Sequence, residues 1–400
     1  MAVATALLAC VEKAGARHEP TARDGLLWAA AYANLLRGTQ CPALGLLNHA
    51  LFEDVIHRAC DALSKTAAAT QDAQPDAEQL KTTATTVLRD VAHSLGQLPL
   101  RDQGYGLLRG VAEAFVAVLC IPNLSEQANE AACDGLTALM NEQRHGDASQ
   151  TSAMVMRLLS PLVLGTFKPP VGCAAPSSRD RTSVRTAALT YVCDLACGFH
   201  EQATAAAGAL AKHLLLRAMD RAEPRTVAAS SAAEIAAALP ALERAGLLRF
   251  TAKLSRSAQV AHRTTACEAA PGLFLACSEE ALEGGGATAA PRTPAGQTPG
   301  SANAKEARAQ SDAAAALIAA LVNRCSDTAP AVRAKALTGV AAIAQSLVHD
   351  AESARAGAGA DDYATLSRVR TLLNLWRRDR FVAKARTGSV HGRPAASPVA

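Results

Sequence analysis

The amino-acid sequence predicts an all-α fold. Of its 400 residues, 50% are hydrophobic, and Ala and Leu supply most of that fraction. Ala and Leu are the strongest apolar helix formers, whereas the aromatic residues that often cover β-sheets make up only 3%. Charged residues reach 19%, which is too few for a long exposed coiled coil. We therefore expect packed helices in two or three domains, or in one repeat array.

The start of the chain is predicted to be a helix and not a secretory signal. No basic residue precedes the mildly apolar residues 1–10, and Glu12 and Lys13 follow them at once. No apolar run reaches the ~18 residues that a membrane span needs, so no membrane contact is expected. The eleven cysteines have no framework spacing. They are expected to be reduced, which predicts a cytosolic or nuclear protein.

Residues 1–165 are predicted to form an N-terminal α-helical region. Helical patterns cover residues 24–36, 52–63, 78–95 and 106–119. These helices have no clear period, so they are either degenerate repeats or a separate helical cap.

Three segments interrupt the helical pattern. Residues 66–79 are polar and contain Pro75, residues 169–178 begin with two prolines, and residues 283–307 are rich in Gly, Pro, Ala and Thr. Such compositions bury too little apolar area to offset chain ordering. We predict linkers at the first two and a disordered insert at 283–307. The tail beyond residue 386 is also expected to be disordered.

A helical hairpin is predicted at residues 312–348. One helix covers residues 312–324, and Asp327 followed by Pro330 marks the start of the next. The apolar residues of the second helix recur at steps of 4, 4, 3 and 4, which places them on one face. These residues are Val332, Ala336, Val340, Ile343 and Leu347.

An R-x-x-A motif recurs with the hairpin. It begins at Arg185, Arg225, Arg263 and Arg333, with spacings of 40, 38 and 70 residues. The last gap includes the 25-residue insert, and 70 − 25 = 45. Two helices every ~40–47 residues is the period of a HEAT repeat. The sequence thus predicts a HEAT-repeat α-solenoid, an armadillo-like superhelix with disordered inserts, with repeats at 166–282 and 308–350.

The recurring arginines are predicted to form a structural spine. An arginine there can reach a carboxylate or a carbonyl at the adjacent turn, and Asp180, Asp220 and Asp327 lie five or six residues before three of them. Ser257 takes that place before Arg263, so a series of aspartate–arginine pairs along the repeats would be interrupted there. The alternative is solvated surface charge. The predicted spine set is Arg185, Arg225, Arg263, Asp327 and Arg333.

The C-terminal segment, residues 351–400, is basic. It holds nine Lys and Arg against four acids, so 9 − 4 = +5, while the remaining 350 residues carry 31 − 32 = −1. Such a segment can neutralise phosphates without reading a sequence, or it can be a solvated tail. We predict it to be partly disordered. The candidate DNA contacts are Arg368, Arg370, Arg377, Arg378, Arg380, Lys384 and Arg386.

No catalytic, cofactor or metal site is predicted, and no small-molecule substrate is expected. Cys193 and Cys197 lie four apart near His200, but cysteine is more often a small core residue than a zinc ligand. The glycines at 284–286 are not followed by Lys-Ser/Thr, so they do not form a phosphate loop.

The string at residues 324–337 (RCSDTAPAVRAKAL) resembles the D-type HEAT-repeat, non-SMC regulatory subunit of condensin II. Residues 220–225 (DRAEPR), 239–240 (LP) and 254–263 (LSRSAQVAHR) are similar to the same family, and the resemblance covers about residues 180–350.

The resemblance implies a non-catalytic scaffold that binds kleisin and SMC subunits and chromatin. It also implies a nuclear, chromosome-associated protein that acts in mitotic chromosome condensation. The family's subunits are longer than this chain, and they do not share its insert or its basic tail. The alternative is a general HEAT-repeat adaptor of the nuclear transport or phosphatase scaffold type.

Overall fold

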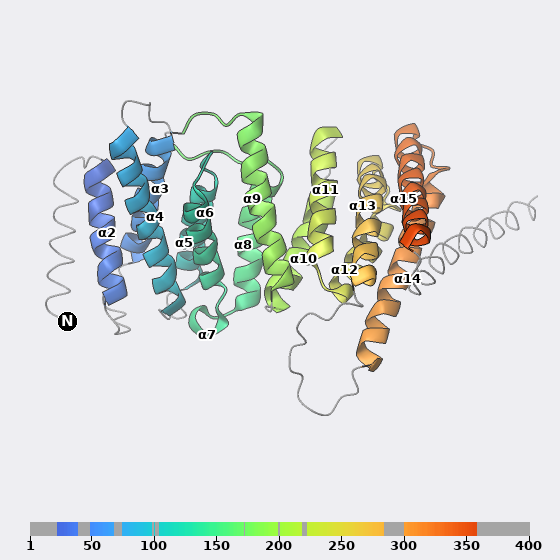
Figure 1. The fold of residues 1–400 in the computed structure, drawn as a ribbon, viewed down its shortest axis with the longest axis horizontal. Coiled ribbons are helices and arrows are strands. Elements are labelled where there is room, and N and C mark those ends of the chain that lie inside the picture. Colours follow the sequence, from blue (N-terminus) through green and yellow to red (C-terminus); the bar gives the residue numbers. More distant parts are fainter. Residues whose placement is uncertain are drawn as a thin grey trace, which may run out of the picture. The chain divides into compact units, whose positions relative to one another are not determined.

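The computed structural model describes residues 22–38, 49–67, 74–97, 100, 104–171, 173–198, 201–217, 222–283 and 300–357. The chain divides into two compact units, Met1–Leu210 and Ala211–Ala400. All regular elements in the described residues are helices (Figure 1). The predicted all-α fold is confirmed. The predicted helix at 1–10 and the tail beyond 386 lie outside the described residues.

Unit 1 contains helices that pack in two rows. The helices are α2 (Ala22–Gly38), α3 (His49–Ala67), α4 (Gln74–Gln97), α5 (Tyr105–Leu119), α6 (Glu126–Leu139), α7 (Glu142–His145), α8 (Ala148–Val163), α9 (Ser178–Cys197) and α10 (Glu201–Leu216), which crosses into unit 2. One row is α2, α4 and α6, and the other is α3, α5 and α8. Contacts between α3 and α4 and between α5 and α6 join the rows, and α9 packs on α8.

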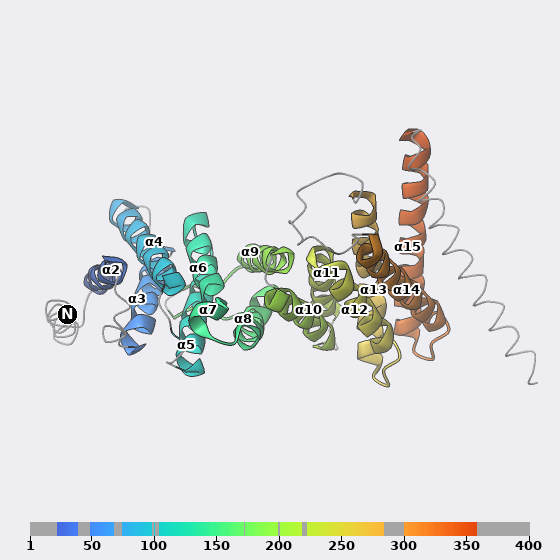
Figure 2. The same ribbon diagram turned by 90° about the horizontal axis from the view of Figure 1, so that it is seen from below.

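Unit 2 repeats the same two-row arrangement. Its helices are α11 (Ala222–Ala238), α12 (Ala241–Leu254), α13 (Val260–Glu283), α14 (Gly300–Arg324) and α15 (Pro330–Gly357). Helices α11, α13 and α15 form one row, and α12 packs on α14 in the other (Figure 2). We call α12 and α14 first helices, and α11, α13 and α15, which form the other row, second helices. Each hairpin contacts its neighbour, which is HEAT-type solenoid packing.

Side-chain caps fix several helix starts in unit 1. Ser125 caps α6 by accepting from the Ala128 amide at 3.4 Å, and Asp147 caps α8 by accepting from the Ser149 amide at 2.9 Å. At α9, Ser177 and Asp180 form a reciprocal capping box. Each cap satisfies backbone N–H groups that have no partner within the helix. These caps therefore stabilise the starts of α6, α8 and α9.

Small residues let the second helices of unit 2 approach closely. A Cβ built on Gly272 of α13 would lie 2.9 Å from Ala233 of α11, and one on Gly339 of α15 would lie 3.1 Å from Pro271 of α13. The alanine of every R-x-x-A motif is also buried, with at most 3% of its surface exposed. These four are Ala188, Ala228, Ala266 and Ala336. An Ala-rich, aromatic-poor chain suits such close helix packing.

The apolar stripe predicted on residues 331–348 faces the core over most of its length. Val332 and Ala336 are fully buried, Ile343 is 6% exposed and Val340 is partly exposed. The side chain of Leu347 lies outside the described residues.

Several predicted breaks are shorter than expected. Helix α14 begins at Gly300, so residues 300–307 of the predicted disordered insert are helical. Residues 301–310 (SANAKEARAQ) are mainly good helix formers and extend α14 backwards. The predicted break at 66–79 is also shorter in the structure. Helix α3 extends to Ala67, and α4 starts at Gln74 with Pro75 in its first turn. Helix α15 continues past residue 350 to Gly357.

No helix in the described part of the chain is long and apolar enough to cross a membrane.

Candidate functional site

The turn between first and second helix has the same geometry in two repeats of unit 2. At 254–260 the Ser257 hydroxyl accepts from the Gln259 amide at 3.2 Å. At 324–330 an Asp327 carboxylate oxygen accepts from the Ala329 amide at 2.9 Å. Ser and Asp side chains both favour this local bond to the amide two residues ahead. The serine at 257 therefore keeps the shape of the turn while removing its charge.

The arginine after each turn folds back onto the turn's carbonyls. The Nη1 of Arg263 donates to the carbonyls of Ser257 and Ala258 at 3.1 and 2.9 Å. The Nη1 of Arg333 donates to the carbonyls of Asp327 and Thr328 at 2.7 and 3.0 Å. Each guanidinium thus ties the second helix to the turn that precedes it.

A two-bond ion pair joins neighbouring repeats at the same place. The Nε and Nη2 of Arg263 each donate to an Asp327 carboxylate oxygen at 3.0 Å, and Arg324 donates to the same carboxylate at 2.8 Å. The Asp327 side chain is only 2% exposed. The hydrogen bond from Arg263 lowers the pKa of Asp327 to about 2. Paired N–H···O bonds of this kind are strong and strict in geometry.

Glu268 links three second helices of unit 2. From α13 its carboxylate lies 3.8 Å from Nε of Arg225 in α11 and 3.2 Å from Nζ of Lys335 in α15. The Thr226 hydroxyl also donates to it. Glu268 is therefore a partner of Arg225 across the repeats. Asp220, suggested by the sequence, lies outside the described residues. Neither Glu268 nor Lys335 was among the predicted residues, and no short motif marks either of them.

In unit 1 two arginines of α9, Arg181 and Arg185, correspond to the recurring arginine of unit 2. Arg225, Arg263 and Arg333 are the fourth residues of their helices, and Arg181 is the fourth residue of α9. Its Nη1 donates to the Gly165 carbonyl at 3.0 Å. Arg185 lies one turn later, where its Nε donates to the Val163 carbonyl at 3.2 Å.

The Asp180 carboxylate does not join this arginine pattern. It is used in the α9 capping box, where the Ser177 amide and hydroxyl donate to it. These bonds lower the pKa of Asp180.

A fully buried arginine in α12 was missed by the sequence analysis. Arg244 donates to the carbonyls of Ala237 and Leu239 at the end of α11, and to the carbonyl of Ala276 in α13, at 3.2, 2.6 and 3.2 Å. It is 0% exposed. The available signal was its place three and four residues before the buried Leu247 and Leu248, which puts it on the apolar stripe of α12.

Three exposed cations lie at the C-terminal end of α12 and in the turn that follows it. Arg249 and Lys253 are four residues apart on one face of α12, and Arg256 lies in the turn, two residues beyond the end of the helix. This cluster is suited to a polyanion, since several positive charges follow one another along a short stretch of the chain. The predicted DNA contacts between residues 368 and 386 lie outside the described residues.

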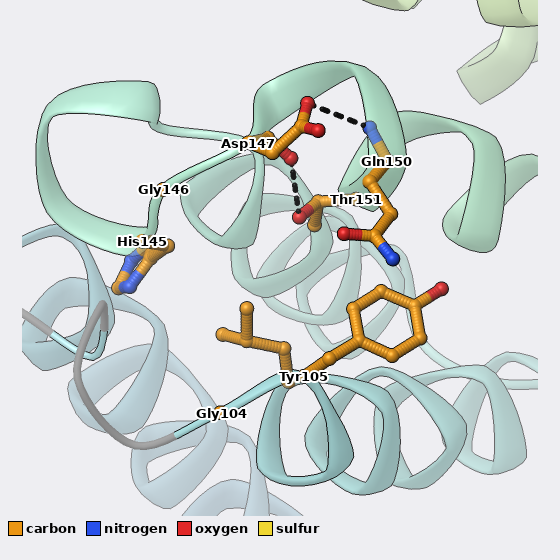
Figure 3. Close-up of a pocket in the computed structure, with 8 residues that line it drawn as sticks. Gly104, Tyr105, His145, Gly146, Asp147, Gln150 and Thr151 are labelled. Carbon is orange, nitrogen blue, oxygen red and sulfur yellow. Dashed lines mark hydrogen bonds between the residues drawn. The ribbon is translucent and has the colours of Figure 1, made fainter.

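Unit 1 contains a small polar hollow of about 270 Å³ between the starts of α5 and α8 (Figure 3). Its polar groups serve the local fold: His145 Nε2 lies 3.0 Å from the Leu95 carbonyl, and Asp147 caps α8 while its carbonyl accepts from the Thr151 hydroxyl. Burial lowers the pKa of His145. Gly146, with φ of 93°, supplies the left-handed conformation between α7 and α8.

The cysteine pair considered as a metal ligand lies on α9. Cys193 is partly exposed and Cys197 is exposed, while His200 lies outside the described residues. Within the described ranges no three His, Cys, Asp or Glu side chains gather in a way that could hold a metal ion. Burial raises the pKa of the Cys60 and Cys267 thiols to about 12, so these thiols stay protonated at neutral pH.

No protein-family model and no curated protein matches the chain. The solved structures that are similar to it include two engineered proteins. An engineered protein from a structural genomics consortium is 15% identical, with 72% of this chain and 96% of that chain covered and a TM-score of 0.22. A designed armadillo repeat protein in complex with the peptide (KR)4 is 17% identical, with 72% and 99% covered and a TM-score of 0.23. The fold description therefore rests on the helix contacts within each unit.

Proposed function

We propose that the chain is a non-catalytic HEAT-repeat scaffold subunit of a condensin II-like complex. It holds kleisin and SMC partners and binds chromatin in the nucleus. The observation that carries the proposal is the place of the string at residues 324–337. Its Asp327 and Arg333 build the turn into a second helix, and Asp327 also binds Arg263 of the neighbouring repeat. The resembled subunit has this string at the start of a second helix.

The scaffold role follows from what the ionic residues do. Arg263, Asp327 and Glu268 bind one helix to the next, and their charges are satisfied inside the solenoid. These ion pairs fix the positions of neighbouring hairpins relative to one another. The exposed faces of the helices are then free to hold partners.

Chromatin contact is supported by the three exposed cations at the end of α12 and in the turn after it, together with the basic segment after residue 367. Phosphate neutralisation by such cations releases counterions and does not depend on sequence. The protein should therefore bind duplex DNA of mixed sequence, and this binding should weaken steeply as salt concentration rises.

Co-purification tests the assignment to a complex. The tagged chain, recovered from the cells that make it, is expected to bring an SMC ATPase pair and a kleisin subunit with it. Recovery of a transport receptor or a phosphatase instead would replace the condensin assignment with the general adaptor.

Fluorescence anisotropy with a labelled DNA duplex tests the chromatin contact. The logarithm of the DNA association constant falls linearly with the logarithm of the salt concentration. The triple variant Arg249→Ala, Lys253→Ala, Arg256→Ala should make this slope less steep by up to about 2.7, at about 0.9 per phosphate contact. Lys305→Ala with Arg308→Ala removes two exposed charges of α14 and is the matched control. Removing residues 368–393 tests the tail in the same assay. An unchanged slope in the triple variant rules out the cations at the end of α12, and an unchanged slope after the deletion rules out the tail.

A further inference from the structure

Helix α15 carries an exposed apolar stripe. Leu337 is 57% exposed and Val348 is 55% exposed, and Ala341 and Ala344 between them are also exposed. The spacings of four, three and four residues place these side chains on one face of the helix. No charged residue occurs between the two ends of the stripe. Single exposed apolar residues are common, but an uncharged stripe of them on one face indicates an interaction surface.

The equivalent face is covered in the other second helices of unit 2. Four residues after the motif arginine, α11 has Ala229 at 5% exposure and α13 has Cys267 at 1%, whereas α15 has Leu337 at 57%. Eleven residues after the arginine, Ala236 and Phe274 are also buried, whereas the residue of α15 is exposed. Helix α15 is the last described helix of this row (Figure 2). It therefore presents a face that elsewhere in unit 2 lies against another helix.

The stripe is symmetrical about its own centre. Read from either end, its spacings are four, three and four, with a large side chain at each end and two alanines in the middle. An antiparallel copy of α15, centred between Ala341 and Ala344, therefore places Leu337 of each helix beside Val348 of the other. The alanines let the two helices approach to about 8 Å. Packed helices cross at about 20°, so they diverge toward the ends, where the larger side chains fill the space.

The charges that flank the stripe favour the same antiparallel arrangement. Arg333 and Lys335 lie within four residues before the stripe, and Asp350 and Glu352 lie within four residues after it. An antiparallel copy brings the basic end of each helix to the acidic end of the other and also opposes the two helix dipoles. A parallel copy would bring like charges together. Because both basic residues keep their contacts within unit 2, this attraction acts over a longer range.

We propose that a second copy of this chain docks on the stripe, α15 against α15, in an antiparallel dimer with two-fold symmetry. A two-fold interface needs a patch that is its own complement, and the symmetrical order of large and small residues supplies one. An unrelated partner would not require this symmetry. The stripe extends over only about 17 Å of helix. Interfaces this small belong to the weak, reversible class, so the dimer forms in a concentration-dependent manner.

Sedimentation velocity of the full chain over a range of concentrations tests the dimer. The monomer should predominate at low micromolar concentration, and the fraction of dimer should rise with concentration. Leu337→Lys should abolish the dimer, because it would place two lysines against the apolar Val348 side chains. Val348→Glu should abolish it for the same reason. Gln127→Lys adds a charge at an exposed position of α6 and is the control, which should leave association unchanged.

Mixing the two stripe variants tests the antiparallel pairing itself. A mixed dimer of Leu337→Lys with Val348→Glu contains one Lys–Glu pair and one unchanged Leu–Val pair. The mixture should therefore regain the dimer that each variant alone has lost. Parallel pairing would bring neither new charge to the other, so a mixture that stays monomeric overturns the proposed arrangement.

The parent and the folding of the variants supply the remaining outcomes. A parent that is monomeric at every concentration would overturn the proposal, because the stripe would then not bind a second copy. A parent dimer that neither stripe variant weakens would also overturn it, because the dimer would then use another surface. Both variants should keep the helical circular dichroism of the parent, since both positions are exposed. Unfolding of either variant would contradict the exposed stripe on which the proposal rests.

Discussion

Arg263 and Asp327 lie 64 residues apart in the chain, yet two N–H groups of the arginine donate to the two carboxylate oxygens of the aspartate at 3.0 Å each. Arg263 lies in the first turn of one second helix, α13, and Asp327 lies in the turn before the next, α15. The contact therefore fixes the register between two repeats. Arg333, six residues after Asp327, binds the backbone carbonyl of Asp327 instead.

The Asp327 carboxylate makes the stability of unit 2 depend on pH. Its bonds lower its pKa from 3.8 to about 2. The stabilisation is therefore fully present above about pH 4 and is lost as the pH falls through about 2. In urea unfolding, the parent should be more stable than Asp327→Asn at about pH 6, and the difference should shrink by about pH 2.5. A difference that stays constant over this range would exclude the ion pair as its source.

Arg333 should stabilise the hairpin of α14 and α15 through the turn carbonyls. Arg333→Ala removes two hydrogen bonds and is expected to lower the free energy of unfolding by about 0.5–3 kcal/mol. Arg308→Ala, at an exposed position of α14, is the control and should change it by less than about 0.5 kcal/mol. Equal effects of the two variants in urea unfolding would mean that Arg333 is only solvated surface charge.

The glycine at 135 should be needed for the contact of α6 with α5. A Cβ at this position would overlap the ring of Phe115, which is fully buried. Gly135→Ala should therefore destabilise unit 1 by about 1–3 kcal/mol through overpacking. Gly96→Ala in α4 meets nothing within 4 Å and should stabilise by up to about 1 kcal/mol. Thermal unfolding of both variants checks the pair, and a melting temperature for Gly135→Ala at or above that of Gly96→Ala would contradict it.

Arg244 should be among the most sensitive residues of unit 2. Arg244→Met keeps most of the side-chain volume but leaves three carbonyls without their buried donor. We expect a loss of roughly 3 kcal/mol in the free energy of unfolding, measured by denaturant titration. Arg249→Met, on the exposed face of the same helix, should stay within about 0.5 kcal/mol. A small effect at both positions would contradict the structural role of Arg244.

The local features could be predicted from the sequence. Helix positions follow from Ala and Leu content, apolar periodicity and capping residues, and Pro330 does begin α15. Ala336 was predicted on the apolar face of its helix because such spacing is a property of a single helix, and it is fully buried. Val184, Ala188, Tyr191 and Leu195 are likewise buried on one face of α9.

The contacts between repeats could not be predicted. The sequence suggested that each aspartate supports the arginine that follows it, but the Asp327 carboxylate binds Arg263 of the preceding repeat. That partner depends on how α13 and α15 pack, which spacing alone does not contain. In α9 the R-x-x-A motif begins at Arg185, so the sequence predicted that arginine. The match of Arg181 to Arg225, Arg263 and Arg333 depends on the first residue of α9, Ser178, which the motif does not give.

A double-mutant cycle between Arg263 and Asp327 tests the central claim that the hairpins are stacked repeats joined by this ion pair. The free energy of unfolding is measured for the parent, Arg263→Ala, Asp327→Ala and the double variant. Stacked repeats predict a coupling energy of about 1–3 kcal/mol, because the two residues touch only when α13 and α15 pack side by side. Additive effects, within about 0.3–0.5 kcal/mol, would contradict it.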